Sequence, residues 1–273
     1  MTRVRTSDDV ELDVKDWGQG RPVVLIHGWP LNADAWEEQA QALVDAGYRV
    51  VSYDRRGFGR SDQPDAGYDY DTLADDLAAV INDRGLTDAA LVGFSMGGGE
   101  VARYMSRHAG RGVSRVAFIS SVVPGVVQSE ANPDGAPGAV LDQMKAAIRA
   151  DRPAFFREFF PSFYGMGWVK RPVSQAVLDW TWGMAMMASP LATIACVDAF
   201  GRTDFTGDVG SIHCPTLIVH GSGDQNVPIK ATSARLASLL PHATFKDYDG
   251  APHGIPATHA ADLNRDLLEL LRA

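Results

Sequence analysis

A serine with a glycine two residues away on either side constrains this chain more than any other feature. Residues 90–94 are apolar enough for a buried strand, and residues 96–108 have the pattern of a helix. Ser95 lies between them, with Gly93 and Gly97 beside it. A side chain at either glycine would collide where strand and helix meet, so the pattern predicts a sharp turn that exposes the Ser95 hydroxyl.

The same residues also fit a simpler interpretation, in which Ser95 caps a glycine-rich helix start. Two observations favour an exposed nucleophile instead. The serine directly follows an apolar strand, and the N-terminus of the following helix is directed at it. A helix N-terminus favours negative charge, which develops when a serine attacks a carbonyl group.

The first half of the chain alternates apolar strands with amphipathic helices. Apolar runs at 23–26 and 50–51 are typical of strands that are buried on both faces of a parallel sheet. Residues 35–46 and 72–84 have helical patterns, and a glycine follows each of them. This alternation predicts an α/β fold with a mostly parallel, doubly wound sheet.

The alternation stops after Ser121. Residues 124–138 are rich in proline and glycine, and residues 140–200 have helical segments with many Phe, Trp and Met residues. The strand pattern returns at 216–219. An apolar underside on such helices would exclude water from the serine. The sequence therefore predicts one core with an inserted helical lid: core residues 1–125, lid residues 126–205 and core residues 206–273.

Composition excludes several classes of protein. The net charge of −9 is spread along the chain without a basic cluster, which disfavours nucleic acid and anionic membranes as partners. No apolar run approaches about 20 residues, and residues 1–9 lack the apolar core of a signal peptide. Two cysteines, Cys196 and Cys214, do not make a disulfide framework. A reducing cytoplasmic location is expected.

A serine hydroxyl attacks a carbonyl efficiently only when a base, usually a histidine held by a carboxylate, takes its proton. In folds with this serine turn, the acid and then the histidine follow along the chain. Asp224 lies on the loop after the apolar segment 216–219, and His253 follows the last predicted strand, 244–248. The sequence therefore predicts a triad of Ser95, Asp224 and His253.

Other acids and histidines compete for these roles. Asp204 and Asp208 are rival acids, and His259 is a rival base that we expect inside a final helix at 257–271. The remaining histidines lie at strand ends, helix ends or turns, where capping and surface roles are typical: His27, His108, His213, His220 and His242. No His, Asp or Glu pair has metal-ligand spacing, so no metal is expected.

Two backbone N–H groups are predicted to form the oxyanion hole. One belongs to Met96, the residue after the serine, and the other to Trp29, in the loop after the strand at 23–26. Pro30 lacks an N–H and restricts the residue before it, so Pro30 is expected to fix the direction of the Trp29 backbone.

Several further segments extend the pattern nearly from end to end: 27–31 (HGWPL), 53–57 (YDRRG), 59–61 (GRS), 93–104 (GFSMGGGEVARY), 203–206 (TDFT), 220–225 (HGSGDQ) and 250–254 (GAPHG). Together they resemble the α/β-hydrolase superfamily. Within it, the chain resembles the cofactor-free bacterial haloperoxidases, perhydrolases and arylesterases. Asn226 departs from this group, whose members usually have an apolar residue there.

The resemblance implies serine hydrolysis of small carboxylic esters or lactones through an acyl-enzyme, without a cofactor. It also implies that hydrogen peroxide can replace water, and that the peracid formed from a carboxylic acid oxidises bromide or chloride. Members with marked perhydrolase activity tend to have a proline at the place of Pro30. Such proteins are often homo-oligomers. The residues expected to line the substrate pocket are Trp29, Pro30, Val123, Phe159, Phe163, Phe200 and Val227.

Other functions remain open at this point. An amidase, a lactamase or a carbon–carbon hydrolase would use the same triad. A ligand-binding receptor with negligible turnover would keep the same pocket. A haloalkane dehalogenase or epoxide hydrolase is disfavoured, because those enzymes need a carboxylate in place of Ser95.

Overall fold

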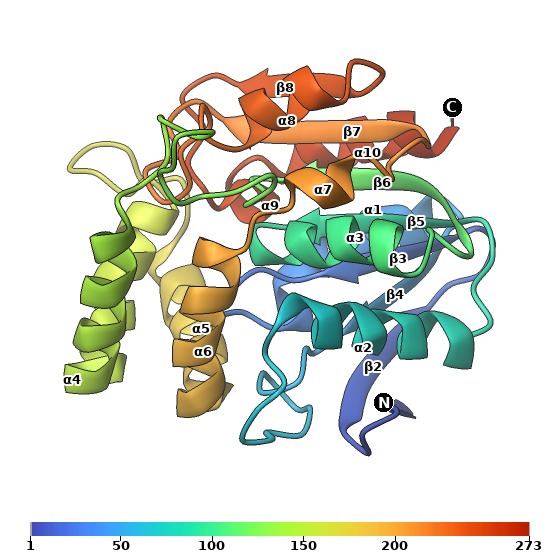
Figure 1. Cartoon of the computed structure of the whole chain (residues 1–273), viewed down its shortest axis with the longest axis horizontal. Helices are drawn as coiled ribbons and strands as arrows, with labels where there is room; N and C mark the ends of the chain where they lie inside the picture. Colours follow the sequence, from blue (N-terminus) through green and yellow to red (C-terminus); the bar gives the residue numbers. More distant parts are fainter. Residues whose placement is uncertain (1, 273) are drawn as a thin grey trace.

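Eight strands form one mixed sheet in the computed structural model, which describes residues 2–272 (Figure 1). The strand order is β1-β2-β4-β3-β5-β6-β7-β8. β2 is antiparallel to β1 and β4, and the other neighbours are parallel. Met1 and Ala273, at the ends of the predicted core segments, lie outside the described residues. The strands are β1 (Thr2–Arg5), β2 (Glu11–Trp17), β3 (Pro22–Ile26), β4 (Arg49–Tyr53), β5 (Ala89–Phe94), β6 (Val113–Ile119), β7 (Thr216–Gly221) and β8 (Thr244–Tyr248).

Helices cover both faces of the sheet, with α2 and α3 packed together on one face and α1 and α10 on the other (Figure 1). This arrangement confirms the predicted α/β class. The helices are η1, a 3-10 turn (Ala33–Trp36), α1 (Glu37–Asp45), α2 (Tyr70–Asp83), α3 (Met96–Arg107), α4 (Gly138–Phe163), α5 (Gln175–Met187), α6 (Pro190–Arg202), α7 (Thr206–Val209), α8 (Ser233–Leu239), α9 (Ile255–Thr258) and α10 (Ala260–Arg272).

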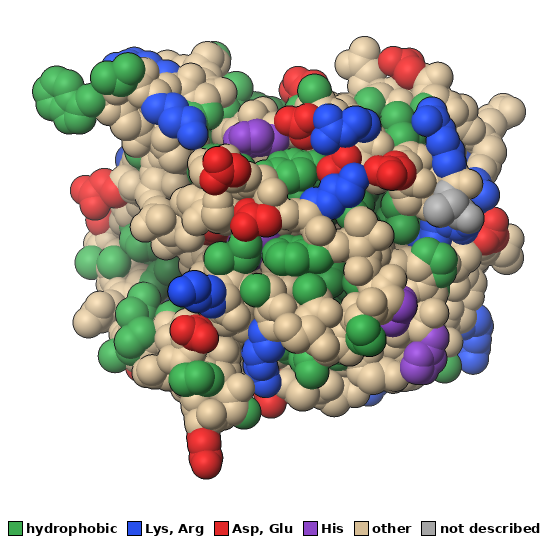
Figure 2. Space-filling view, turned by 90° about the horizontal axis from the view of Figure 1, so that it is seen from above, with side chains coloured by type: hydrophobic (Ala, Val, Ile, Leu, Met, Phe, Trp, Pro, Cys, Tyr) green, Lys and Arg blue, Asp and Glu red, His purple; other side chains and the backbone are tan. Residues whose placement is uncertain are grey.

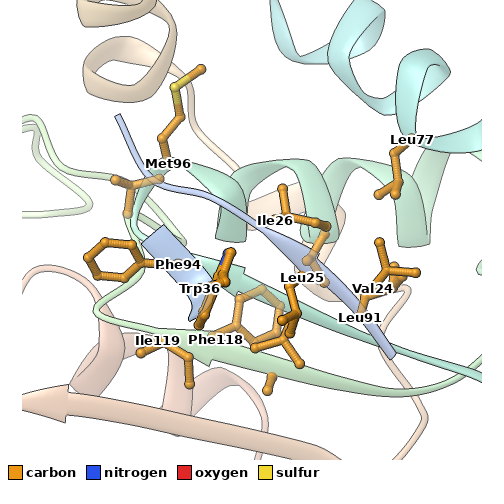
Figure 3. Packing of buried hydrophobic residues seen from close by; sticks show 14 of the residues in the cluster. Val24, Leu25, Ile26, Trp36, Leu77, Leu91, Phe94, Met96, Phe118 and Ile119 are labelled. Atoms are coloured by element: carbon orange, nitrogen blue, oxygen red, sulfur yellow. The ribbon is translucent and has the colours of Figure 1, made fainter. Parts of the chain in front are cut away.

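The central strands are apolar because helices cover them on both sides. Every residue of β3, β5 and β7 is buried, whereas the edge strands β1 and β8 are largely exposed. Leu77 of α2 faces the sheet, where Val24 and Leu91 lie on neighbouring strands (Figure 3). The hydrophobic core is therefore centred on β3 and β5, the strands whose ends carry the candidate site.

The winding of the sheet reverses direction next to β3. From β3 the chain crosses to β4 on one side, and it returns to β5 on the other side. Loops that leave two such neighbouring parallel strands diverge and leave a crevice at the carboxyl edge of the sheet. The segments that contain Trp29 and Ser95 follow β3 and β5, so the reversal places both at this crevice.

Helices α4, α5 and α6, which fall within the segment predicted as a lid and are called the lid helices below, lie together at one end of the sheet, inserted between β6 and β7 (Figure 1). α4 is kinked at Asp151, whose φ of −158° and ψ of 89° are not helical. Pro153 follows two residues later and cannot donate a backbone hydrogen bond, which accounts for the break. The Asp151 carboxylate accepts the Ala154 N–H at 2.9 Å and caps the second part of the helix.

The final helix differs from the prediction. His259 separates α9 from α10 with non-helical dihedral angles, so the expectation that His259 lies inside one helix is wrong. The Thr258 hydroxyl lies 2.9 Å from His259 Nδ1 and also donates to the Gly254 carbonyl at 3.1 Å. Such local side-chain bonds compete with a continuous helix.

Charged side chains of both signs alternate over one face of the molecule, among scattered hydrophobic ones (Figure 2). Between residues 2 and 272, no single helix is both long and apolar enough to cross a bilayer. α5 and α6 pass that test only as a pair, and a bend of 99° separates them.

The glycines around Ser95 are required by close backbone contacts, as predicted. A Cβ atom on Gly97 would lie 2.4 Å from the Ile26 carbonyl oxygen, and one on Gly93 would lie 2.5 Å from the Gly97 oxygen. Gly183 in α5 has no atom within 4 Å of such a position.

We therefore expect Gly97→Ala to destabilise the protein although alanine favours helices. The backbone contact cannot relax without shifting β3 from α3, at a cost of about 1–3 kcal/mol. Gly183→Ala serves as the control and should stabilise by about 0.5–1 kcal/mol. Urea unfolding of both variants measures the difference. Equal stability of the two variants would contradict the close approach.

Candidate active site

Ser95 occupies a strained turn between β5 and α3. Its φ of 54° and ψ of −117° are unfavourable for a residue with a side chain. The Ser95 N–H donates to the Ile119 carbonyl oxygen at 2.8 Å, so the neighbouring strand β6 helps to hold the turn. The strand-to-helix turn predicted from the sequence is therefore present.

The structure brings Ser95, Asp224 and His253 together. His253 Nε2 lies 2.9 Å from Ser95 Oγ, and His253 Nδ1 lies 2.6 Å from Asp224 Oδ2. All three residues are buried, with exposed fractions of 6%, 8% and 2% in that order. This geometry lets the imidazole take a proton from the hydroxyl while the carboxylate holds the ring.

Backbone and side-chain donors surround the Asp224 carboxylate. Oδ1 accepts the N–H groups of Asn226 and Val227 at 2.8 and 2.9 Å. Burial alone would raise the pKa of Asp224, but the neighbouring charge of His253 and hydrogen bonds from His220 and His253 hold it well below its usual range. Asp224 is therefore ionised at neutral pH.

His220 contacts the acid, although the sequence pattern indicated only a residue at a strand end. His220 Nε2 lies 3.0 Å from Asp224 Oδ2 and 3.1 Å from the Val227 carbonyl oxygen. His220 Nδ1 lies 2.7 Å from the Ser233 hydroxyl. The fully buried ring thus ties β7 to the Asp224 loop and to α8. A histidine four residues before the acid was the available sequence signal.

Two aromatic rings hold the His253 side chain. The Phe94 and Phe163 ring centroids lie 5.2 and 5.0 Å from that of His253. The Ser120 hydroxyl donates to the His253 carbonyl oxygen at 3.1 Å, and the Gly254 N–H donates to the Phe163 oxygen at 2.8 Å. Phe163 therefore connects the lid to the histidine.

The loop after β3 approaches the serine closely. A Cβ atom on Gly28 would lie 3.1 Å from Ser95 Cβ and 2.8 Å from the Phe94 ring. Neither the Trp29 N–H nor the Met96 N–H donates to another described residue. Both amides are thus available for an oxyanion. The Trp29–Pro30 peptide bond is cis.

Trp29 also belongs to the lid interface. Its indole N–H donates to the Thr193 carbonyl oxygen of α6 at 3.0 Å. Its ring lies among lid aromatics, with ring centroids 5.3 Å from Phe156, 5.8 Å from Phe159 and 5.4 Å from Phe200. The side chain of Trp29 is therefore fixed between the core and the lid.

A buried ion pair between Arg55 and Glu100 helps to hold the loop after β3, which contains His27 and Trp29. The Arg55 guanidinium donates to Glu100 Oε1 and to the His27 carbonyl oxygen, with Nε–Oε1 and Nη2–O distances of 2.6 Å. Tyr53 donates to Glu100 Oε2 at 2.7 Å. Arg55 and Glu100 are at most 1% exposed. Because Glu100 belongs to α3, the pair connects the helix after Ser95 to the loop before Trp29.

His27 is neutral in this network. Burial first, and the charge of Arg55 second, hold the pKa of His27 well below its usual range. Its Nε2 accepts the Arg55 backbone N–H at 3.0 Å, which assigns the proton to Nδ1, 2.9 Å from the Gly28 oxygen. His27, Arg55 and Glu100 all belong to the sequence motifs, but the motifs did not predict that Arg55 contacts both His27 and Glu100.

A cavity of about 50 Å³ opens onto Ser95 and His253. Four of the residues predicted to line it do so, namely Trp29, Phe159, Phe200 and Val227, and the prediction missed three others, Val122, Met144 and Asn226.

Three other predicted lining residues do not line this cavity: Pro30, Val123 and Phe163. Phe163 packs on His253 and lines a separate, smaller hollow with Tyr164 and Trp180. Val123 is fully buried before a cis proline.

The rival residues have other partners. Asp204 accepts the Thr206 N–H at 2.8 Å, Asp208 lies 3.0 Å from the Arg103 guanidinium, and the His259 ring lies 6.0 Å from that of Tyr248. No group of three His, Cys, Asp or Glu residues between positions 2 and 272 is arranged to hold a metal ion.

The fold, with the turn that carries Ser95 at the carboxyl edge of the sheet, is that of a known class of protein. Residues 21–260 match the family model for the α/β hydrolase fold. The chain belongs to the α/β hydrolase family, as the sequence motifs predicted.

Its similarity to particular members extends over the whole chain. It is 46% identical to a non-heme chloroperoxidase of Kitasatospora aureofaciens, over 97% of this chain and 98% of the relative. It is 40% identical to a bifunctional esterase/perhydrolase of Acinetobacter calcoaceticus, over 100% of both. The crystal structure of a bromoperoxidase from Bacillus anthracis has a TM-score of 0.96 and 42% identity, covering 100% of this chain and 99% of that one.

The buried ion pair yields a stability prediction. Glu100→Ala should leave the Arg55 guanidinium buried without its carboxylate and cost about 3–5 kcal/mol. Glu269→Ala is the control, because Glu269 forms an ion pair with Lys246 but is 72% exposed in its side chain. Such exposed pairs contribute about 0–1 kcal/mol. Urea unfolding measures both variants, and a loss below 1 kcal/mol for Glu100→Ala would contradict the prediction.

Proposed function

We propose that this protein is a serine hydrolase of small carboxylic esters or lactones that also forms peracids from carboxylic acids and hydrogen peroxide. The Ser95–His253–Asp224 relay, with its 2.9 and 2.6 Å contacts, is the observation that carries the proposal. The sequence identity of 46% to a non-heme chloroperoxidase and of 40% to an esterase/perhydrolase supports the formation of peracids.

Acylation begins when His253 Nε2 takes the Ser95 proton as Oγ attacks the ester carbonyl carbon. The ionised Asp224 stabilises the imidazolium that forms and holds Nδ1–H in place. The imidazolium then gives its proton to the leaving alcohol as the carbon–oxygen bond breaks. The product is an ester between the acyl group and Ser95.

The unpaired N–H groups of Trp29 and Met96 stabilise the negative oxygen of the tetrahedral intermediate. Each such donor contributes about 3 kcal/mol in the transition state. The first turn of α3 follows Met96, so the helix dipole acts on the same oxygen. The Arg55–Glu100 pair maintains the distance between the segments that carry these donors.

Deacylation depends on the second nucleophile. Water, deprotonated by His253, releases the carboxylic acid and restores Ser95. Hydrogen peroxide in the same position releases a peracid and restores Ser95. With a carboxylic acid as the acyl donor, water leaves in the first step, so acid and peroxide give peracid and water.

The size of the cavity supports small acyl groups. A volume of about 50 Å³ is a few times the roughly 10–15 Å³ that a cavity needs to hold one water molecule. The walls are largely apolar, from Trp29, Val122, Phe159 and Phe200. Short apolar acyl or alcohol groups fit such a space, while long chains exceed it.

Replacing the nucleophile tests the proposal directly. Ser95→Ala should lower kcat for an aryl acetate by a factor on the order of 10⁶, because the triad loses the group that forms the acyl-enzyme. Release of the aryl alcohol is the measurement. Ser238→Ala, an exposed serine in α8, is the control with unchanged rate. Full activity of Ser95→Ala would overturn the proposal.

The peracid route makes a separate prediction. Bromination of a reporter with hydrogen peroxide and bromide should require added acetate, because peracetic acid is the oxidant. The peracid oxidises bromide to hypobromous acid and returns acetate. Loss of bromination with Ser95→Ala is the internal control. Equal bromination in a carboxylate-free buffer would rule this route out while leaving ester hydrolysis untouched.

A further inference from the structure

One polar side chain stands out in the wall of the active-site cavity. Apart from Ser95 and His253, the residues that line the cavity have aromatic or aliphatic side chains or a thioether, except Asn226. The indole N–H of Trp29 is already bonded to Thr193. Asn226 therefore provides the amide in an otherwise apolar lining.

The Asn226 amide lacks a partner within the protein. Its Oδ1 atom is buried and has no hydrogen-bond partner among residues 2–272. The backbone of Asn226 is fixed instead, because its N–H donates to Asp224 Oδ1 at 2.8 Å and the next N–H, of Val227, donates to the same oxygen at 2.9 Å. The side chain is thus held at the cavity by its backbone, while its amide group stays unpaired.

An unpaired amide in apolar surroundings disfavours ligands that cover it without a hydrogen bond. A ligand that supplies a partner is favoured, because the desolvated amide is then satisfied. A hydroxyl group both donates and accepts, so it pairs with the amide NH₂ group or, after rotation of the amide exchanges the NH₂ group and the buried Oδ1, with the amide oxygen.

The geometry points to Asn226 as a specificity-determining residue whose amide binds a hydroxyl group of the substrate. The preferred substrates are short esters that carry a hydroxyl within a few atoms of the scissile carbonyl, rather than alkyl esters of equal size. The small size of the cavity limits how far the hydroxyl can lie from the scissile carbonyl. This inference rests on the proposed hydrolase function and refines its substrate class.

Two pairs of esters of matched size test it. Methyl lactate against methyl isobutyrate places the hydroxyl on the acyl part, and 2-hydroxyethyl propionate against propyl propionate places it on the alcohol part. The ratio of kcat/KM within each pair is the readout. The unmodified protein should prefer the hydroxylated member of at least one pair, and the pair that responds identifies which part of the ester meets Asn226.

Asn226→Leu removes the amide at similar size and should reduce that preference about tenfold, the effect of one lost neutral hydrogen bond. Asn226→Ala should reduce it as well and covers the case in which leucine blocks the cavity. Gln225→Leu is the matched control, since this neighbouring amide is exposed and donates to the Gly223 oxygen. It should keep the preference of the unmodified protein.

Two results would overturn the inference in distinguishable ways. Ester turnover without preference for a hydroxylated member, or with a preference that both Asn226 variants keep, removes the role of Asn226 and leaves the hydrolase function standing. Failure of the unmodified protein to hydrolyse any of the four esters overturns the proposed function and this inference together.

Discussion

The parallel pairing of β3 with β5, where the winding of the sheet reverses, is the constraint on which the site depends. It places the loop after β3 beside the turn after β5, close enough that Gly28 has no room for a side chain. The strained Ser95 conformation persists because β6 and α3 hold it from both sides. The order of the strands therefore determines the geometry of the site as much as the side chains of Ser95, Asp224 and His253 do.

Buried charge maintains that arrangement. Arg55 and Glu100 neutralise each other, and Arg55 also donates to the His27 carbonyl oxygen. A similar division occurs at Asp224, where one carboxylate oxygen accepts two backbone N–H groups and the other faces two imidazoles. In both cases, a buried ionised group fixes the backbone next to the reacting atoms.

Local patterns were enough to predict the fold and the positions of Ser95, Asp224 and His253, because each follows a predicted strand: Ser95 and Asp224 follow buried apolar strands, and His253 follows the last strand, β8. Their catalytic roles remain predictions. Contacts between distant segments were not predictable. The His220 contact with Asp224 and the Arg55–Glu100 pair depend on side-chain directions that no spacing encodes. Phe159 and Phe163 lie one helical turn apart in the part of α4 that follows the kink at Asp151, yet Phe159 lines the cavity and Phe163 packs on His253.

The bond between the Trp29 indole and Thr193 couples two parts of the molecule with different tasks. The same residue carries a backbone donor beside Ser95 and a side chain that is anchored in α6. Outward movement of α6 must either break that bond or pull on the Trp29 backbone, whose N–H we propose as a donor to the substrate oxygen. Under the proposed function, opening of the helices over the cavity would therefore also displace this backbone donor and slow the reaction.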